Sequence, residues 1–281
     1  MVGKTKKGVA RYCAILAAMA GIMVFCSCPT NETNETNGTN ETNGTNEKPK
    51  EIRVLSYNIQ HGEGNDNKLD LERTAATIAA QNPDLVAVQE VDRITGRSKG
   101  IDQAEKLGEL TGMNAVFGKT IPFNYGEYGL AILSKYPIKA HKITQLPQLG
   151  DRENRVVLEA EIELDDNRTL LFACTHFCHQ SEERRMLQAE KINELFAERD
   201  GLVILAGDFN ATPGQKPIGV LKAKWSEAPN EKPTYPATNP SRRIDYIFYR
   251  PADMVQVKET SVINDPMTSD HLPLLAVLEW K

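Results

Sequence analysis

The sequence predicts an α/β domain in which two packed β-sheets are flanked by helices. Many short apolar runs of strand length occur along residues 51–281, whereas only a few segments show the apolar spacing of an amphipathic helix. Many strands with few helices indicate two sheets that pack together, with helices on their flanks. At 281 residues, the chain is long enough to bury the core of one such domain.

The strand predictions rest on apolar or β-branched runs that are bounded by turn residues. In chain order, the predicted strands are Ile52–Tyr57, Leu85–Val91, Ala115–Gly118, Leu130–Ser134, Val156–Leu164, Leu170–His176, Leu202–Ala206, Tyr246–Tyr249, Val255–Val262 and Leu274–Leu278.

Three helices are predicted, and the first and the third are expected to begin at a capping residue. Asp70 begins the first helix, whose inward face is expected to hold Leu71, Ala75, Ile78 and Ala79. The second helix spans Asp102–Leu110 and is closed by Gly112. Ser181 caps a long third helix that is predicted to reach Arg199, with an inward face of Met186, Ala189, Ile192 and Phe196.

The charge balance excludes a body that attracts polyanions through its net charge. The whole chain has a net charge of -5, and residues 51–281 hold 27 basic against 34 acidic residues. A body with this excess of acid exerts no long-range attraction on nucleic acid. Any phosphate chemistry would therefore depend on a local site, and a metal ion is the most direct way to build one.

The first 28 residues have the pattern of a secretory signal peptide. Basic residues at positions 4–11 precede an apolar run over Tyr12–Cys28. Ser27-Cys28 resembles a bacterial lipoprotein cleavage site, so we predict that residues 1–28 are a signal peptide and that Cys28 becomes acylated. An uncleaved membrane anchor is the alternative.

Residues 29–50 are predicted to be a disordered tether, because repeats of Asn-Glu-Thr and Asn-Gly-Thr contain no apolar residue. Tether and lipid would place the body, residues 51–281, in the cell envelope outside the cytoplasm, on a bacterial outer membrane or cell surface. The body contains Cys174 and Cys178, four positions apart in a strand-like run and therefore too far apart for a disulfide if extended.

Polar residues gather where the predicted strands end or begin. They are Asn58, Glu90, His176, Asp208, Asn210, Asp245, Asp270 and His271. Each has a structural explanation of its own, since Asn58 and Asp208 could be turn residues and Asp270 could cap a turn. Eight such residues at strand ends are an improbable coincidence, and loops on a rigid sheet are where functional sites are built.

These residues belong to short motifs that occur in a fixed order along residues 52–278. The motifs are Ser56-Tyr57-Asn58, Val88-Gln89-Glu90-Val91, Thr175-His176-Phe177, Gly207-Asp208-Phe209-Asn210, Arg243-Ile244-Asp245-Tyr246-Ile247 and Ser269-Asp270-His271. The ordered set resembles the endonuclease/exonuclease/phosphatase superfamily, and the two histidines resemble its deoxyribonuclease I-like branch most. The resemblance implies a four-layer α/β/β/α sandwich of two mixed sheets and Mg²⁺-dependent cleavage of a phosphate ester.

The resemblance also implies a metal site for Mg²⁺, with Mn²⁺ or Ca²⁺ as alternatives. Glu90 would be the main ligand, with Asn58 and Asp270 beside it. A hard cation held by carboxylate and amide oxygens would neutralise the phosphate charge that otherwise repels a nucleophile. Arg155 lies where the family often has an arginine that contacts the phosphate of the substrate.

The remaining residues would then carry the in-line attack of water. His271 is expected to take a proton from the water, and Asp245 to orient the imidazole and stabilise its charged form. Asp208 and Asn210 would place the water and bind a phosphoryl oxygen. His176 would donate a hydrogen bond to the phosphate or to the leaving oxygen.

Softer expectations concern the residues around this set. Tyr128–Ser134 resembles a further strand motif of the superfamily, with a structural role favoured. Arg93, Arg97 and Lys99 follow Glu90 and could line a substrate rim or form a solvated loop.

The substrate stays open at this point, because the superfamily spans nucleases and phosphatases of several kinds. A nucleic acid or a sugar phosphate is one possibility, and a lipid or inositol-phosphate head group, as in a sphingomyelinase or a remodelling enzyme of glycosylphosphatidylinositol lipids, is the alternative. A non-catalytic surface binding module is a second alternative. The chain is expected to act as a monomer.

Overall fold

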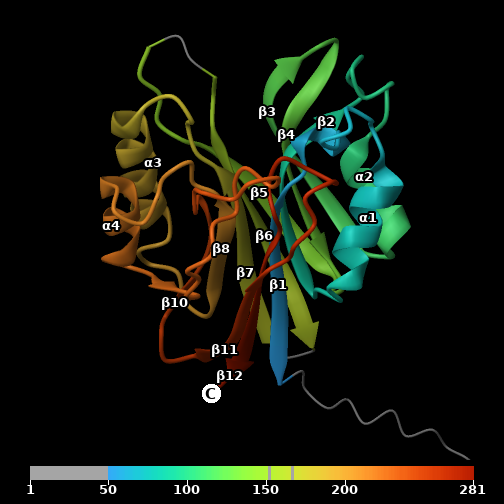
Figure 1. Cartoon of the computed structure of the whole chain (residues 1–281). Helices are drawn as coiled ribbons and strands as arrows, with labels where there is room; N and C mark the ends of the chain where they lie inside the picture. Colours follow the sequence, from blue (N-terminus) through green and yellow to red (C-terminus); the bar gives the residue numbers. More distant parts are fainter. Residues whose placement is uncertain (1–49, 151–152, 166–167) are drawn as a thin grey trace, which may run out of the picture. The chain divides into compact units, whose positions relative to one another are not determined.

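The computed structural model describes residues 50–150, 153–165 and 168–281, and Figure 1 shows how their elements are arranged. The predicted fold class is confirmed. The described residues contain two mixed sheets of six strands each, which pack against each other and carry helices on their outer faces. The assignments of a signal peptide, an acylated Cys28 and a tether fall outside the described residues and stay predictions.

The first sheet has the strand order β11-β12-β1-β2-β4-β3. Its strands are β1 (Glu51–Asn58), β2 (Leu85–Arg93), β3 (Asn114–Phe123), β4 (Gly126–Ser134), β11 (Val255–Val262) and β12 (Leu274–Trp280). β1 and β2 are parallel, with Val54 opposite Leu85, and the other neighbouring pairs are antiparallel. The chain therefore closes this sheet by placing its last strand beside its first.

The second sheet has the strand order β5-β6-β7-β8-β10-β9. Its strands are β5 (Ile138–Gln145), β6 (Val156–Asp165), β7 (Arg168–His176), β8 (Val203–Asp208), β9 (Ser226–Glu227) and β10 (Asp245–Arg250). β7 and β8 are parallel, with Leu171 opposite Val203, and the other neighbouring pairs are antiparallel. Both sheets thus have one parallel pair at their centre.

Four α-helices cover the outer faces of the sheets, α1 and α2 on the first and α3 and α4 on the second (Figure 1). They are α1 (Leu71–Ala80), α2 (Gln103–Thr111), α3 (Glu182–Leu195) and α4 (Lys216–Lys222), and a short 3₁₀ turn, η1 (Gln60–Gly62), follows β1. Between the sheets, residues such as Val54 and Phe172 form one core, while Ile78 packs beneath α1 and Phe196 beneath α3 in two outer cores. Three apolar layers therefore separate four layers of secondary structure.

Side-chain caps, two of them predicted, explain where three of the helices begin. The side chain of Asp70 accepts a hydrogen bond from the backbone N–H of Arg73, and Asp102 caps α2 in the same way. Gly112 ends α2 with a φ of 68°, a left-handed conformation that favours glycine. Ser181 accepts from the backbone N–H of Arg184 at the start of α3.

The third helix differs from its prediction in length and in its buried face. α3 ends at Leu195, four residues before the predicted Arg199, because Phe196 is the C-cap. Met186 is only half-buried, whereas Arg184 and Arg185 are buried. The first turn of α3 lies over the backbone that follows β7, where Arg185 donates to the carbonyl oxygens of Cys178 and His179, so this turn buries donors rather than apolar groups.

Cys174 and Cys178 are both buried and free, which agrees with the expectation that they form no disulfide. Within the described ranges, no helix is both long enough and apolar enough to cross a lipid bilayer.

Candidate active site at one end of the sandwich

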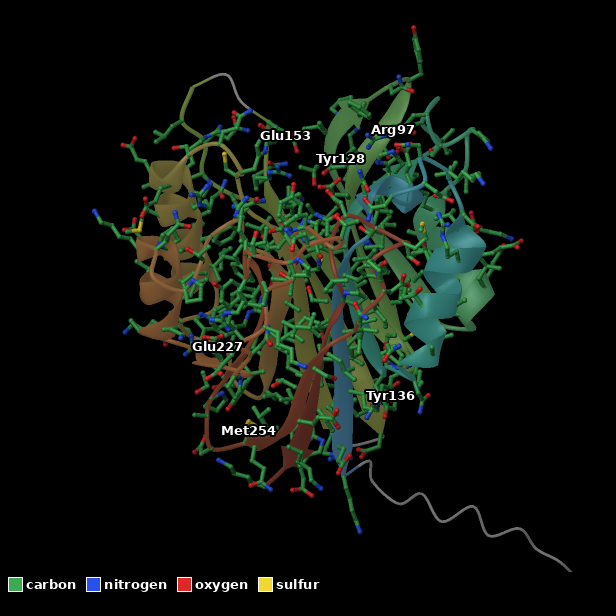
Figure 2. The ribbon with its side chains drawn as sticks, in the orientation of Figure 1. Arg97, Tyr128, Tyr136, Glu153, Glu227 and Met254 are labelled. Atoms are coloured by element: carbon green, nitrogen blue, oxygen red, sulfur yellow. The ribbon has the colours of Figure 1, made fainter. Side chains whose placement is uncertain are left out.

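The carboxyl ends of the two parallel pairs, β1–β2 and β7–β8, lie at the same end of the sandwich (Figure 1). A cavity of about 480 Å³ opens there, and its lining includes Glu90, Arg155, His176, Asp208, Asn210, Asp270 and His271. Asn58 and Asp245 lie behind this lining and bond to residues in it. Arg97, Tyr128 and Glu153 also line the cavity and lie at this end, far from Met254 (Figure 2).

Glu90 reaches the cavity through an irregularity in β2. The register of β2 against β4 shifts between Gln89 and Val91, so Glu90 is the extra residue of a β-bulge. Its φ of 60° lies in the left-handed region, which a glutamate adopts only where the surrounding structure holds it. There Asn58 Nδ2 donates to Glu90 Oε1 at 3.0 Å.

Asp208, the last residue of β8, is the carboxylate on which both sheets converge. Its Oδ2 lies 3.3 Å from Asn58 Nδ2 and 3.3 Å from His176 Nε2, and its Oδ1 accepts from the backbone N–H of Asn210 at 2.8 Å. Burial alone would raise the pKa of Asp208, but His176 and His271 outweigh that effect and hold the pKa well below its usual range. The carboxylate of Asp208 is therefore ionised and held by Asn58, His176 and the backbone of Asn210.

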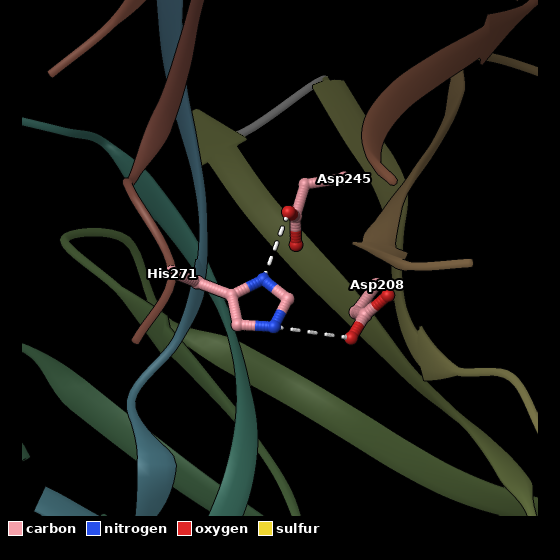
Figure 3. A group of neighbouring side chains, drawn as sticks. All are labelled: Asp208, Asp245 and His271. Atoms are coloured by element: carbon pink, nitrogen blue, oxygen red, sulfur yellow. Dashed lines mark hydrogen bonds and ion pairs between the residues drawn. The ribbon is translucent and has the colours of Figure 1, made fainter. Parts of the chain in front are cut away.

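His271 joins Asp208 to Asp245, as Figure 3 shows. Its Nδ1 lies 3.0 Å from Asp245 Oδ2, which is the hydrogen bond expected from the sequence, and its Nε2 lies 3.7 Å from Asp208 Oδ2. Thr234 Oγ1 donates to the same oxygen of Asp245 at 2.5 Å. Burial alone would lower the pKa of His271, but the charges of Asp245, Asp208 and Asp270 raise it to about 10.

His176 is held from both sides by residues of the second sheet. Arg155 Nη1 lies 3.2 Å from His176 Nδ1, and because an arginine only donates, this nitrogen accepts. The other nitrogen, Nε2, then carries the hydrogen and faces Asp208. Arg155 is also paired with Glu153 at 2.8 Å, so the arginine expected to contact phosphate is already held by its neighbours.

The motifs on these strands match a family model over most of the chain. The model of the endonuclease/exonuclease/phosphatase family matches residues 55–271, which include every polar residue discussed above. The chain belongs to the endonuclease/exonuclease/phosphatase family.

Individual relatives are more distant. YbhP of Escherichia coli, described only as uncharacterized, is 25% identical over 247 residues, covering 80% of this chain and 95% of that one. An endonuclease/exonuclease/phosphatase structure from Beutenbergia cavernae has a TM-score of 0.70 and 24% identity, covering 82% of this chain and 72% of that one. A mannosyl-6-phosphatase of Bacteroides thetaiotaomicron has a TM-score of 0.68 and 19% identity, covering 82% and 100%. The structural likenesses show the shared fold.

Enzymes of the endonuclease/exonuclease/phosphatase family typically depend on a divalent metal ion, and the donors in this cavity fit one. Glu90 and Asp270 both line the cavity. Burial raises the pKa of Asp270, and the charges of Glu90 and Asp208 add to the effect although His271 opposes it. Carboxylates gathered against their own repulsion are what a hard cation stabilises.

Asn58 and His271 fit the metal less directly. Asn58 Oδ1 accepts from the backbone N–H of Gln60, so its amide nitrogen, not its oxygen, faces Glu90. Asp208, Asp245 and His271 have ligand atoms within 4.8 Å of one another. Both ring nitrogens of His271 already face carboxylate oxygens, so we interpret this group as a hydrogen-bonded His271–Asp245 pair with Asp208 as an ion-pair partner, rather than as a ligand set.

Among the residues that line the cavity, Tyr235 and Arg242 were not singled out from the sequence, and Tyr128 was noted only as part of a strand motif with a structural role favoured. The ring of Tyr235 lies 4.8 Å from that of His271, and the Arg242 guanidinium lies 5.6 Å from the Tyr235 ring. Burial, and then the charge of Glu90, raise the pKa of Tyr128. Tyr235 and Arg242 lie in an irregular loop without apolar periodicity, so only the tertiary structure reveals them, whereas the Tyr128–Ser134 motif was a usable signal.

Proposed function

We propose that this protein is a divalent-metal-dependent hydrolase of small phosphate esters. One observation carries the proposal: two carboxylates suited to a metal and two histidines line one cavity, and Asp245 bonds to His271 from behind that lining. Membership of a family of phosphoesterase hydrolases supports the same reaction class. The lipid head-group alternative rests on the N-terminal segment, which lies outside the described residues.

The metal would be held by Glu90 and Asp270. When bound, it would neutralise charge on the phosphoryl group and offset the carboxylate charge that raises the pKa of His271. Asn58, which donates to both Glu90 and Asp208, would keep these two carboxylates in place.

His271 would take the proton of the attacking water once its imidazole is neutral. Asp245 accepts from Nδ1, so Nε2 is the atom that would receive the proton. Asp245 then stabilises the imidazolium that forms. Burial of the pair keeps it apart from bulk water, since both residues are at most 4% exposed.

The second sheet would hold the phosphoryl group from the other side. His176 keeps a hydrogen on Nε2, which faces the carboxylate of Asp208. A phosphoryl oxygen that enters the cavity would compete with Asp208 for that hydrogen and receive it as charge develops.

The substrate would be small. A cavity of about 480 Å³ is the size of a site for one compact ligand. Residues 51–281 hold 27 basic and 34 acidic residues, which gives no support to tight binding of a nucleic-acid duplex. The structural relative that acts as a mannosyl-6-phosphatase supplies a natural first probe, mannose 6-phosphate.

The test is hydrolysis by the full chain with Mg²⁺, Mn²⁺ or Ca²⁺. It is measured as phosphate released from mannose 6-phosphate, p-nitrophenol released from p-nitrophenyl phosphate and bis-p-nitrophenyl phosphate, phosphocholine released from sphingomyelin, and nicking of plasmid DNA. We expect turnover of small esters with Mg²⁺, complete loss in excess chelator, and recovery when Mg²⁺ is added back. Undiminished turnover in chelator would refute metal dependence. Binding without turnover on every substrate would instead support the non-catalytic alternative.

A further inference from the structure

The three arginines of the cavity wall differ in what balances their charge. Arg97 is paired with the buried carboxylate of Asp92 at 2.7 Å, and Arg155 with Glu153 at 2.8 Å. Arg242 also lines the cavity, but no carboxylate of the described residues pairs with it. Arg242 is therefore the cavity arginine whose charge is still available to a ligand.

The position of Arg242 is fixed by a small hairpin rather than by an ion pair. The backbone N–H of Arg242 donates to Tyr235 O at 2.8 Å, and the N–H of Tyr235 donates to Arg242 O at 3.0 Å. The guanidinium stacks at 5.6 Å from the ring of Tyr235, which itself contacts His271. A stacked guanidinium keeps the hydrogens at its edge free for an anion.

Arg185 is a neighbour of Arg242. Burial lowers the pKa of Arg185 most, and the charge of Arg242 adds to this effect, although Cys178 and Glu182 oppose it. Arg185 is buried, and it donates to backbone carbonyls of the segment that carries His179. The carboxylates Glu90 and Asp270, by contrast, are the groups suited to the metal. The cavity thus combines these carboxylates with an arginine that no carboxylate of the described residues neutralises.

We propose that Arg242, stacked on Tyr235, binds a second anionic group of the substrate, carried by the same small molecule as the phosphate that is cleaved. This rests on the proposed function. The scissile phosphate would occupy the centre between His271 and His176, and the second group would lie one aromatic ring away. The favoured substrate class is a sugar or polyol that bears two phosphates.

The test compares mannose 6-phosphate with mannose 1,6-bisphosphate, using the full chain with Mg²⁺. Because a hydrogen bond from a charged guanidinium is stronger than a neutral one, we expect KM to be about tenfold or more lower for the bisphosphate. Arg242→Gln should remove this preference by raising KM for the bisphosphate alone, with kcat unchanged. Arg242→Lys keeps the charge without the planar stack and should keep part of the preference.

Arg250→Gln is the matched control, because Arg250 also stacks on an aromatic ring, 5.7 Å from Trp225, outside the cavity. This variant should keep the full preference for the bisphosphate. Equal KM values for the two sugars in the unaltered protein would overturn the inference. So would an Arg242→Gln variant that loses both substrates equally, because the arginine would then act on the scissile phosphate or on the fold.

Calorimetric titration of both sugars separates this inference from the proposed function. If neither sugar is hydrolysed but the bisphosphate still binds more tightly through Arg242, the proposed function fails and the second anion site stands. If both sugars are hydrolysed but the bisphosphate is not preferred, the proposed function stands and the second anion site fails. A third probe, a single-stranded dinucleotide with a 5′-phosphate, would overturn the small-molecule form if it were preferred to the bisphosphate in an Arg242-dependent way.

Discussion

The two halves of the sandwich repeat one topology with different chemistry. In the first half β1, α1, β2, α2, β3 and β4 follow one another, and in the second half β7, α3, β8, α4, β9 and β10 do the same. Each half has a central parallel pair, and an antiparallel strand, β12 or β6, flanks it. Asn58 and His176 end the first strands of the two pairs, while Glu90 and Asp208 lie near the ends of the second strands.

The difference lies in how each carboxylate is satisfied. Glu90 is half-buried on a bulge, and among the side chains that the structure describes, Asn58 alone donates a hydrogen bond to it. Asp208 is fully buried and surrounded by Asn58, His176, His271 and the backbone of Asn210. Glu90 and Asp208 therefore occupy equivalent positions in the two halves but have different roles. The carboxylate of Glu90 is open to a ligand, whereas that of Asp208 holds neighbouring side chains in place.

Glu90→Gln and Asp208→Asn should separate these roles most strongly. Several kcal/mol of charge stabilisation should be lost with Glu90, so we expect kcat/KM to fall about 10³-fold and the Mg²⁺ activation midpoint to rise. The melting temperature should hardly change. Asp208→Asn should lose activity and also about 3–5 kcal/mol of stability, because two buried histidines lose their carboxylate. Metal titrations measure the activation midpoint of each variant, and thermal melts measure its stability. Equal losses of stability in the two variants would contradict this distinction.

A double-mutant cycle on His271 and Asp245 tests the hydrogen bond that joins the two halves. His271 precedes β12 of the first sheet, and Asp245 begins β10 of the second. His271→Ala should lower kcat by about 10²-fold or more, the usual range of general-base assistance. Asp245→Asn should cost a comparable factor, and the double variant little more than either alone. Additive losses, or near-native kcat in His271→Ala, would remove His271 from the role of base.

The helix caps give the smallest and most closely matched comparison. Asp70→Ala at α1 and Ser181→Ala at α3 should each lower the free energy of unfolding by about 1 kcal/mol. Only Ser181→Ala should also raise KM, because the first turn of α3 holds the backbone of Cys178 and His179 through Arg185. Urea unfolding curves measure the free energy of unfolding of both variants, and steady-state kinetics measure KM. A rise in KM for Asp70→Ala would show that the halves are not independent.

Much of this architecture could be predicted because its signals are local. Apolar runs marked the central strands, and Asp70, Asp102 and Ser181 marked helix starts through side-chain hydrogen bonds within one turn. β5 was missed because it is an edge strand with mostly exposed side chains, and such a strand has no apolar pattern. α4 was missed because seven residues offer too few positions to show helical periodicity.

The site was predictable in its residue types but not in its geometry. Strand-end motifs brought Glu90, Asp208 and His271 to attention, yet the positive φ of Glu90 depends on the register of β2 against β4. The Asn58 amide oxygen points away from Glu90 because it accepts a hydrogen bond from the backbone N–H of Gln60. The charge of Arg242 is available to a ligand because carboxylates pair with Arg97 and Arg155 instead. Only the folded structure shows which arginines are paired.

The pairing of β1 with β12 makes residues 274–280 a condition for completing the first sheet. β1 lies inside this sheet, so one of its edges stays unpaired until those residues exist. That contact joins almost the most distant parts of the domain, and its loop closure is slow to form. His271 lies just before β12, so the segment that closes the sheet also delivers the histidine. During synthesis, we therefore expect one late segment to complete both the first sheet and the proposed site.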